Sequence, residues 1–143
     1  MAILSSETLH ATSVAIGGKS ILIMGRSGSG KSDLALRLID RGAVLISDDY
    51  TIVQRSKGGL SASAPATIRG KIEVYGVGII EVKNVQNIPV VLLVTLDDPI
   101  ERMPPCNSSR NIAGIALRLL SVSAYEASAP IKIEIAVASW QTQ

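Results

Sequence analysis

The 143-residue chain contains no phenylalanine, one tryptophan and three tyrosines, so aromatic side chains can fill little of its interior. Hydrophobic residues still make up 47% of the sequence, which predicts a core of isoleucine, valine, leucine and alanine. Such a core suits buried strands covered by helices. The single cysteine, Cys106, excludes an internal disulfide framework. The sequence has no apolar run of about 18 residues, as a membrane span would need, and no signal-peptide pattern at its start.

Charge of either sign is also scarce. Charged residues make up 18% of the chain, and the formal net charge is +2. This balance is too small to indicate a nucleic-acid partner or an anionic membrane surface. We therefore expect a cytoplasmic protein that forms a single domain over residues 1–143.

The hydrophobic pattern predicts more strand than helix. Helical spacing is clear only in residues 31–40, where Gly42 follows as a stop signal. Residues 112–120 fit either a strand or a helix. The strands that the pattern predicts cover residues 13–16 and 20–24 as a hairpin, 43–47, 50–56, the very hydrophobic 90–96, and 131–137, which alternate apolar and polar side chains. The predicted fold is α/β, with a βαβ unit near the start and a mixed, strand-rich sheet.

Residues 25–32, GRSGSGKS, fit the phosphate-binding pattern G-x-x-x-x-G-K-[ST]. An apolar strand precedes them and an amphipathic helix follows, which is the context that the motif requires. Its glycines allow successive backbone N–H groups to converge on an anion, and the helix N-terminus adds positive potential. The lysine can reach the β- and γ-phosphates, and the last serine can ligate Mg²⁺. The predicted nucleotide-binding residues are Gly25, Arg26, Ser27, Gly28, Ser29, Gly30, Lys31 and Ser32.

Asp48 and Asp49 end the strand that follows this loop and helix. Ligands of open α/β sheets bind beyond the carboxyl ends of strands, so this acidic pair is expected to face the phosphates. One carboxylate can act as a base on an incoming hydroxyl or water, and the other can help to hold Mg²⁺. The alternative is a strand-end turn, where aspartate is common.

Four further features have both a functional and a structural interpretation. His10, the only histidine, can hydrogen-bond an aspartate or lie on the surface. Glu73 can ligate a metal ion or belong to the solvated face of a strand. Arg102, in a polar loop, can neutralise charge during phosphoryl transfer or remain in solvent. Asp97 and the aspartate after it end a strand, and the proline that follows favours a loop-start role.

Four features follow one another along the chain with compact spacing: His10, the loop GRSGSGKS, the segment LALRLIDRGAVLISDDYTIV and the segment IRGKIEVYGVGII. In this order and spacing they closely resemble the catalytic domain of HPr kinase/phosphorylase. This bacterial family phosphorylates a serine of the phosphocarrier HPr, and some members remove the phosphate by phosphorolysis. The resemblance implies a phosphate-loop kinase core similar to phosphoenolpyruvate carboxykinase, the cofactors ATP and Mg²⁺, HPr as partner, and a hexamer. It covers most of the chain and is strongest from His10 to about residue 82.

The resemblance also implies roles for single residues. Asp48 matches the base of the kinase direction, Asp49 is its neighbour in the acidic pair, and His10 matches a histidine expected beside them. Glu73 opens the family signature E-x-R-G-x-G and is implied as a Mg²⁺ ligand, with Ser32. Arg102 resembles a family arginine near the phosphates.

The chain departs from the long members of the family in three respects. Tyr75 stands where the signature has arginine, and the chain begins almost at the kinase core, as in the short form that lacks the N-terminal domain. The late segment rich in proline, arginine and glycine that long members use for switching has no obvious counterpart, and Lys132 is a poor match to it. The activity expected is an ATP-dependent serine kinase. The alternatives are a small-molecule kinase and a nucleotide-binding sensor without transfer. The sparse arginines late in the chain argue against a small-molecule kinase with an arginine-rich lid.

Overall fold

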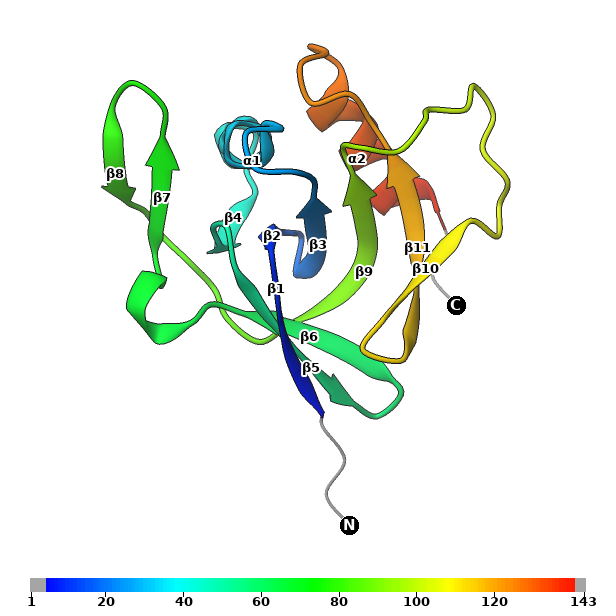
Figure 1. Cartoon of the computed structure of the whole chain (residues 1–143), viewed down its shortest axis with the longest axis horizontal. Coiled ribbons are helices and arrows are strands. Elements are labelled where there is room, and N and C mark those ends of the chain that lie inside the picture. Colours follow the sequence, from blue (N-terminus) through cyan, green and yellow to red (C-terminus); the bar gives the residue numbers. More distant parts are fainter. Residues whose placement is uncertain (1–4, 141–143) are drawn as a thin grey trace.

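The computed structural model describes residues 5–140, so the predicted domain limits, 1 and 143, lie outside the described residues (Figure 1). Within this range lie eleven strands, two α-helices and the short 3₁₀ helix Ala66–Ile68. The helices are α1 (Lys31–Asp40) and α2 (Ala129–Ser139). The strands are β1 (Ser6–Leu9), β2 (Ala11–Ile16), β3 (Lys19–Met24), β4 (Val44–Ser47), β5 (Thr51–Ser56), β6 (Gly59–Ser63), β7 (Lys71–Val74), β8 (Gly78–Glu81), β9 (Ile88–Thr95), β10 (Ser109–Ile112) and β11 (Ile115–Ser121).

Strand β9 is at the centre of a mixed sheet with the order β1-β5-β6-β9-β3-β2-β4. One edge of β9 pairs in parallel with β3, and its other edge pairs first with β6 and then, at Leu93–Thr95, in parallel with β11. The prediction of a central strand over residues 90–96 is confirmed. Because β3, β9 and β11 are parallel, their carboxyl ends reach the same edge of the sheet.

The predicted hairpin is confirmed as β2 and β3, which pair antiparallel from Ala11 and Met24 to Ile16 and Lys19. Strand β2 also pairs antiparallel with β4, so β3 and β4 run in the same direction. The βαβ unit β3-α1-β4 is therefore present, but β2 lies between its two strands. The acidic pair follows β4 and lies two strands away from β3 in the order of the sheet.

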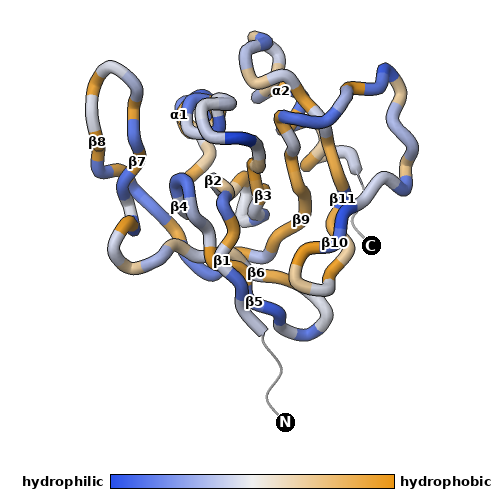
Figure 2. The backbone as a smooth tube through the Cα atoms, in the orientation of Figure 1, coloured by the Kyte–Doolittle hydropathy of each residue, from blue (hydrophilic) through white to orange (hydrophobic). Residues whose placement is uncertain are grey.

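The central strands are buried on both faces, which explains their nearly continuous hydrophobic runs. In β3, Ile21 and Ile23 join a core cluster with both helices, whereas Leu22 joins a second cluster on the opposite face. Residues Leu92–Val94 of β9 alternate in the same way. The sheet curls, so that β1, β5, β6, β10 and β11 cover the second cluster (Figure 1). Figure 2 shows this hydrophobic interior along β3, β9 and β11.

Helix α1 has the predicted bounds, 31–40. Leu34, Ala35 and Leu38 are buried on the face that meets the sheet, at the i, i+1 and i+4 spacing of one helical stripe. The helix stops at Arg41, and Gly42 follows with a φ of 111°, a left-handed conformation that glycine adopts at little cost. Neither helix of the described residues is long and apolar enough to cross a membrane.

The prediction of a strand over residues 131–137 is wrong, because these residues belong to α2. The alternation of isoleucine with charged residues fits a helix equally well: Ile131 and Ile135 are one turn apart on the outer face, and Ile133 lies on the inner face. Ile133 is 0% exposed, whereas Ile135 is 58% exposed. Pro130 in the first turn also favours a helix start. The ambiguous residues 112–120 form the end of β10, a turn, and β11.

This correction makes a prediction about stability. Replacing Ile133 by alanine should lower the free energy of unfolding by about 2–5 kcal/mol, because a buried isoleucine is truncated in a packed core. Replacing the exposed Ile135 should change it by no more than about 0.5 kcal/mol. Urea denaturation of both variants measures the difference. Equal losses would mean that the two side chains share one buried face, as in a strand.

Candidate active site

The phosphate loop, residues 25–32, connects the carboxyl end of β3 to the N-terminus of α1. A turn closes it, in which the Ser29 N–H donates to the Arg26 carbonyl over 3.0 Å. Gly30 caps the helix with a φ of 101°. The first turn of α1 therefore directs its free N–H groups toward the space in front of the loop, where an anion would be stabilised.

Lys31 is the buried cation of this loop, with 6% of its surface exposed. Its Nζ donates to the carbonyls of Gly25 at 2.9 Å and Arg26 at 3.1 Å. These two bonds hold the ammonium group within the curve of the loop. A buried lysine needs such partners, because an unpaired charge away from water is costly.

Asp48 is buried and connects three elements of the site. Its Oδ1 accepts hydrogen bonds from Ser32 Oγ at 2.6 Å and from Thr12 Oγ1 at 3.3 Å. Its Oδ2 accepts the backbone N–H of Glu73 at 2.9 Å. This one carboxylate thus fixes the phosphate loop, β2 and β7 relative to one another.

Asp49 has a different environment from its neighbour. Its Oδ1 lies 2.8 Å from His10 Nε2, and its backbone N–H donates to Thr12 Oγ1 at 3.0 Å. The His10 ring also stacks on Tyr50, with 5.2 Å between the ring centroids. Asp49 has a φ of 70° and lines the cavity in front of the phosphate loop, whereas Asp48 is not among the lining residues. The predicted contact between His10 and an aspartate is therefore present.

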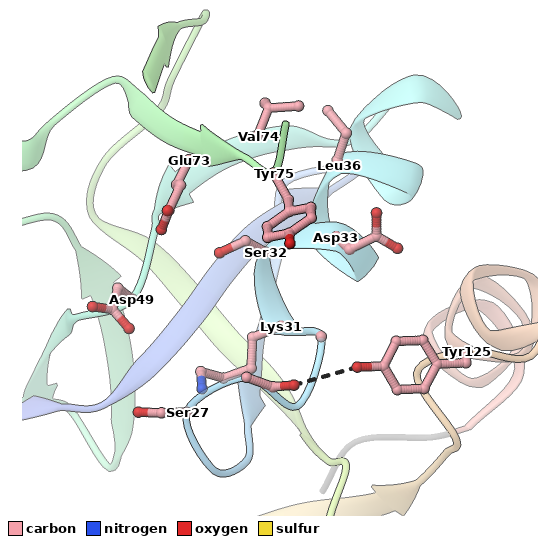
Figure 3. Close-up of a pocket in the computed structure, with 12 residues that line it drawn as sticks. Ser27, Lys31, Ser32, Asp33, Leu36, Asp49, Glu73, Val74, Tyr75 and Tyr125 are labelled. Atoms are coloured by element: carbon pink, nitrogen blue, oxygen red, sulfur yellow. Dashed lines mark hydrogen bonds between the residues drawn. The ribbon is translucent and has the colours of Figure 1, made fainter. Parts of the chain in front are cut away.

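The cavity has a volume of about 850 Å³, within the usual range for small-molecule sites. It is lined by the phosphate loop, the start of α1, Asp49, β7 and the residue after it, and Tyr125. Figure 3 shows Asp49 and Glu73 on one side of Lys31, with Tyr125 on the other side. The structure thus brings the loop, the acidic pair, His10 and Glu73 together at one site.

Oxygen atoms suited to Mg²⁺ gather on the Asp49 side of this cavity. Ser32 Oγ and Asp48 Oδ1 are 2.6 Å apart, and the Glu73 carboxylate lines the same cavity. Mg²⁺ prefers oxygen ligands and usually combines one or two carboxylates with water and substrate phosphates. Among residues 5–140, no group of three or more His, Cys, Asp or Glu side chains is arranged to hold a metal ion by itself. The donors present fit a Mg²⁺ ion that is shared with phosphates.

Two arginine side chains that the sequence placed at the site, those of Arg102 and Arg26, lie apart from the Mg²⁺-suited oxygen atoms. Arg102 belongs to the exposed segment between β9 and β10 and does not line the cavity. The Arg26 side chain is 85% exposed and pairs with Asp97, with 3.5 Å between Nε and Oδ1. Asp97 also accepts the Arg26 backbone N–H at 2.9 Å, so it supports the phosphate loop in addition to starting the next segment.

Sequence reasoning missed two residues of the site, Thr12 and Tyr125. Thr12 bridges the acidic pair by donating to Asp48 and accepting from Asp49. Its position two residues after His10, near the start of β2, was the only available signal. Tyr125 Oη donates to the Gly28 carbonyl at 3.3 Å, although the two residues are 97 positions apart. No local pattern indicated this contact.

Comparison with known proteins agrees with this geometry. The family model for the HPr serine kinase C-terminal domain matches residues 2–143. HPr kinase/phosphorylase of Brevibacillus brevis is 42% identical over 104 residues, which cover 66% of this chain and 33% of that protein. HPr kinase/phosphorylase of Alkaliphilus metalliredigens is 34% identical over 131 residues, which cover 87% of this chain and 42% of that protein. The chain thus spans less than half the length of these curated relatives.

The fold also has a counterpart among solved structures. The HPr(Ser) kinase/phosphatase of Coxiella burnetii superposes with a TM-score of 0.80 at 30% sequence identity. The match covers 92% of this chain and 94% of that one, and it confirms the predicted strand-rich α/β fold with few helices. The family match over almost the whole length and the match of fold lead to the same conclusion: this chain belongs to the HPr serine kinase C-terminal domain family.

Proposed function

We propose that this chain is an ATP- and Mg²⁺-dependent kinase that phosphorylates a serine of an HPr-type phosphocarrier. One observation carries the proposal. The last serine of the phosphate loop is hydrogen-bonded to Asp48, and the next carboxylate, Asp49, faces the same cavity beside His10. A phosphate donor and an acceptor hydroxyl can thus meet within one site. The phosphocarrier target is inferred from family membership.

Each part of the site has a role in this proposal. The backbone N–H groups of the loop and of the first turn of α1 bind the β- and γ-phosphates, and Lys31 contributes its positive charge. Ser32, Asp48 and Glu73 are the residues that would hold Mg²⁺. When bound, the ion neutralises charge that develops on the phosphoryl group. The catalytic problem is then one of alignment and electrostatics, as in other phosphoryl transfers.

We assign the catalytic base to Asp49, whereas the sequence analysis expected Asp48. Both oxygens of Asp48 already accept hydrogen bonds from other elements, and its side chain is buried. Asp49 faces the cavity, and among residues 5–140 its carboxylate has only His10 as a hydrogen-bond partner. In the forward step Asp49 takes the proton of the serine hydroxyl, the serine oxygen bonds to the γ-phosphorus, and the bond to the β-phosphate oxygen breaks to release ADP. His10 positions the Asp49 carboxylate.

The test is phosphorylation of HPr with γ-labelled ATP and Mg²⁺. We expect label on purified HPr, in an acid-stable phosphoserine, and no label on an HPr variant whose acceptor serine is replaced by alanine. Chelation of Mg²⁺ should abolish the transfer.

Other outcomes separate the alternatives. A chain that binds ATP but labels no protein would support a nucleotide-binding sensor. Label on a small molecule, with HPr unlabelled, would support a small-molecule kinase. Incubation of phospho-HPr with inorganic phosphate tests the reverse step by release of pyrophosphate. The hexamer implied by the resemblance stays a prediction.

A further inference from the structure

Tyr125 lines the cavity on the side opposite Asp49 (Figure 3). The residue is 75% exposed, yet its hydroxyl donates to the Gly28 carbonyl of the phosphate loop at 3.3 Å. Figure 3 shows it opposite Asp49, with Lys31 between them. The hydroxyl is therefore anchored on the loop, while most of the ring surface stays open to the cavity. An exposed aromatic ring held by its polar end is suited to contact a planar ligand.

The backbone that carries Tyr125 is fixed against the phosphate loop and α1. Arg37 of α1 donates to the carbonyls of the residues on either side of Tyr125, Ala124 and Glu126. Ala124 packs so closely that a Cβ added to Gly30 would lie 3.0 Å from its Cβ. The ring is thus held in place before any ligand arrives, which lowers the entropy cost of binding.

The order of the parallel strands determines what can reach this ring. The acidic pair follows β4 on one side of the phosphate loop, and Tyr125 follows β11 on the other side. The proposed function sets the γ-phosphate beside the acidic pair, and the present inference rests on that orientation. The phosphates of the nucleotide then lie along the loop, and the nucleoside lies beyond the loop, near the carboxyl ends of β9 and β11. Tyr125 is the aromatic side chain that lines this end of the cavity.

We propose that Tyr125 is the platform on which the base of the nucleotide stacks. The ring supplies a π-face to the base, and the hydrogen bond to Gly28 sets the ring beside the phosphate loop. Stacking of a base on an aromatic side chain changes affinity by about 5- to 150-fold when the side chain is truncated to alanine. Tyr125 contacts the nucleoside and takes no part in the transfer of the phosphoryl group.

The experiment compares two ligands in the presence of Mg²⁺: ATP, and tripolyphosphate, which has the phosphates but no nucleoside. Calorimetry gives both affinities for the intact chain and for the variants Tyr125→Ala, Tyr125→Leu and Tyr125→Phe. We expect Tyr125→Ala to lower the affinity for ATP by at least about fivefold and to change the affinity for tripolyphosphate by no more than about twofold. Tyr125→Phe, which keeps the π-face but loses the hydrogen bond to Gly28, should lose less ATP affinity than Tyr125→Ala, and Tyr125→Leu, which is apolar without a π-face, should resemble Tyr125→Ala.

Three results would overturn the proposal: unchanged ATP affinity in Tyr125→Ala, equal losses for both ligands, or an intact chain that binds tripolyphosphate as well as ATP. Equal losses would assign Tyr125 to the shape of the phosphate loop alone. Binding of tripolyphosphate also reports that each variant is folded at the loop. Because no acceptor protein is used, failure to phosphorylate HPr would refute the proposed function without affecting this result. An intact chain that binds neither ligand would refute both.

Discussion

Replacement of Asp49 by asparagine should lower the rate of phosphoryl transfer to HPr by about 10²- to 10⁴-fold, the usual contribution of a positioned general base. Asparagine has nearly the same shape but cannot take the proton of the serine hydroxyl. Affinity for ATP should change little, because Asp49 faces the cavity and is not among the contacts of the loop or of Ser32. Rapid-quench measurement of the rate, together with calorimetry for ATP, tests both parts.

Asp48→Asn is the matched control, and it should behave differently. An amide at this position offers one oxygen, so either Ser32 or the backbone N–H of Glu73 loses its acceptor. We expect a loss of stability of about 1–3 kcal/mol from that unsatisfied donor. Mg²⁺-dependent ATP affinity should fall as well, since the carboxylate beside Ser32 is part of the proposed ion site.

The contrast between the two variants decides the assignment of the base. If Asp48→Asn loses only the rate of transfer while Asp49→Asn stays active, Asp48 is the base, as the resemblance implied. If Asp49→Asn loses ATP affinity in proportion to its rate, Asp49 belongs to the nucleotide site and not to the proton transfer. Replacement of His10 by glutamine keeps one hydrogen bond to Asp49. The rate of phosphoryl transfer of this variant should lie between the rates of Asp49→Asn and of the intact chain.

Replacement of Gly30 by alanine should abolish measurable ATP binding and destabilise the fold. The residue has a φ of 101°, outside the region that alanine adopts easily, and a Cβ would lie 3.0 Å from the Cβ of Ala124. The left-handed conformation costs roughly 1–2 kcal/mol, and the close contact adds to it. The chain can relieve both only by moving the loop or the segment that carries Ala124. Either movement displaces the backbone N–H groups that would bind the phosphates.

Gly17→Ala separates the local backbone cost from the effect on the loop. Gly17 also has a positive φ, 57°, but a Cβ there would meet no atom within 4 Å, and it lies in the turn between β2 and β3. We expect a stability loss of roughly 1–2 kcal/mol with ATP binding intact. Chemical denaturation and calorimetry on the two variants make the comparison. Gly30→Ala with normal ATP affinity would show that the loop tolerates a side chain at its junction with α1.

The local parts of the site could be predicted from the sequence. The phosphate loop, the hairpin before it and the helix after it depend on glycine conformation, alternation and helical spacing within about thirty residues. The structure confirms the hairpin and the helix on either side of the loop. The resemblance to the family extended this to His10 and Glu73, and the structure brings both to the acidic pair. Composition also indicated the aliphatic core that fills both faces of the sheet.

Other features depend on packing between distant segments, which a local pattern does not contain. Residues 131–137 fit a strand or a helix until the inner face of α2 meets the core, where only one of three isoleucines, Ile133, is buried. Asp48 and Asp49 are adjacent and chemically identical in sequence. Their environments diverge because β2 and β7 surround the first, while a left-handed turn directs the second to the cavity.

The sequence by itself therefore determined the phosphate-loop motif, the strand and helix on either side of it, and where the first helix begins, because those properties depend on neighbouring residues. The tertiary structure decided which carboxylate meets Ser32, which one lines the cavity, and that Tyr125 lies on the opposite side of Lys31. These are contacts between residues 16 to 97 positions apart. Only the curled sheet, which brings the ends of β4 and β11 to either side of one loop, creates them.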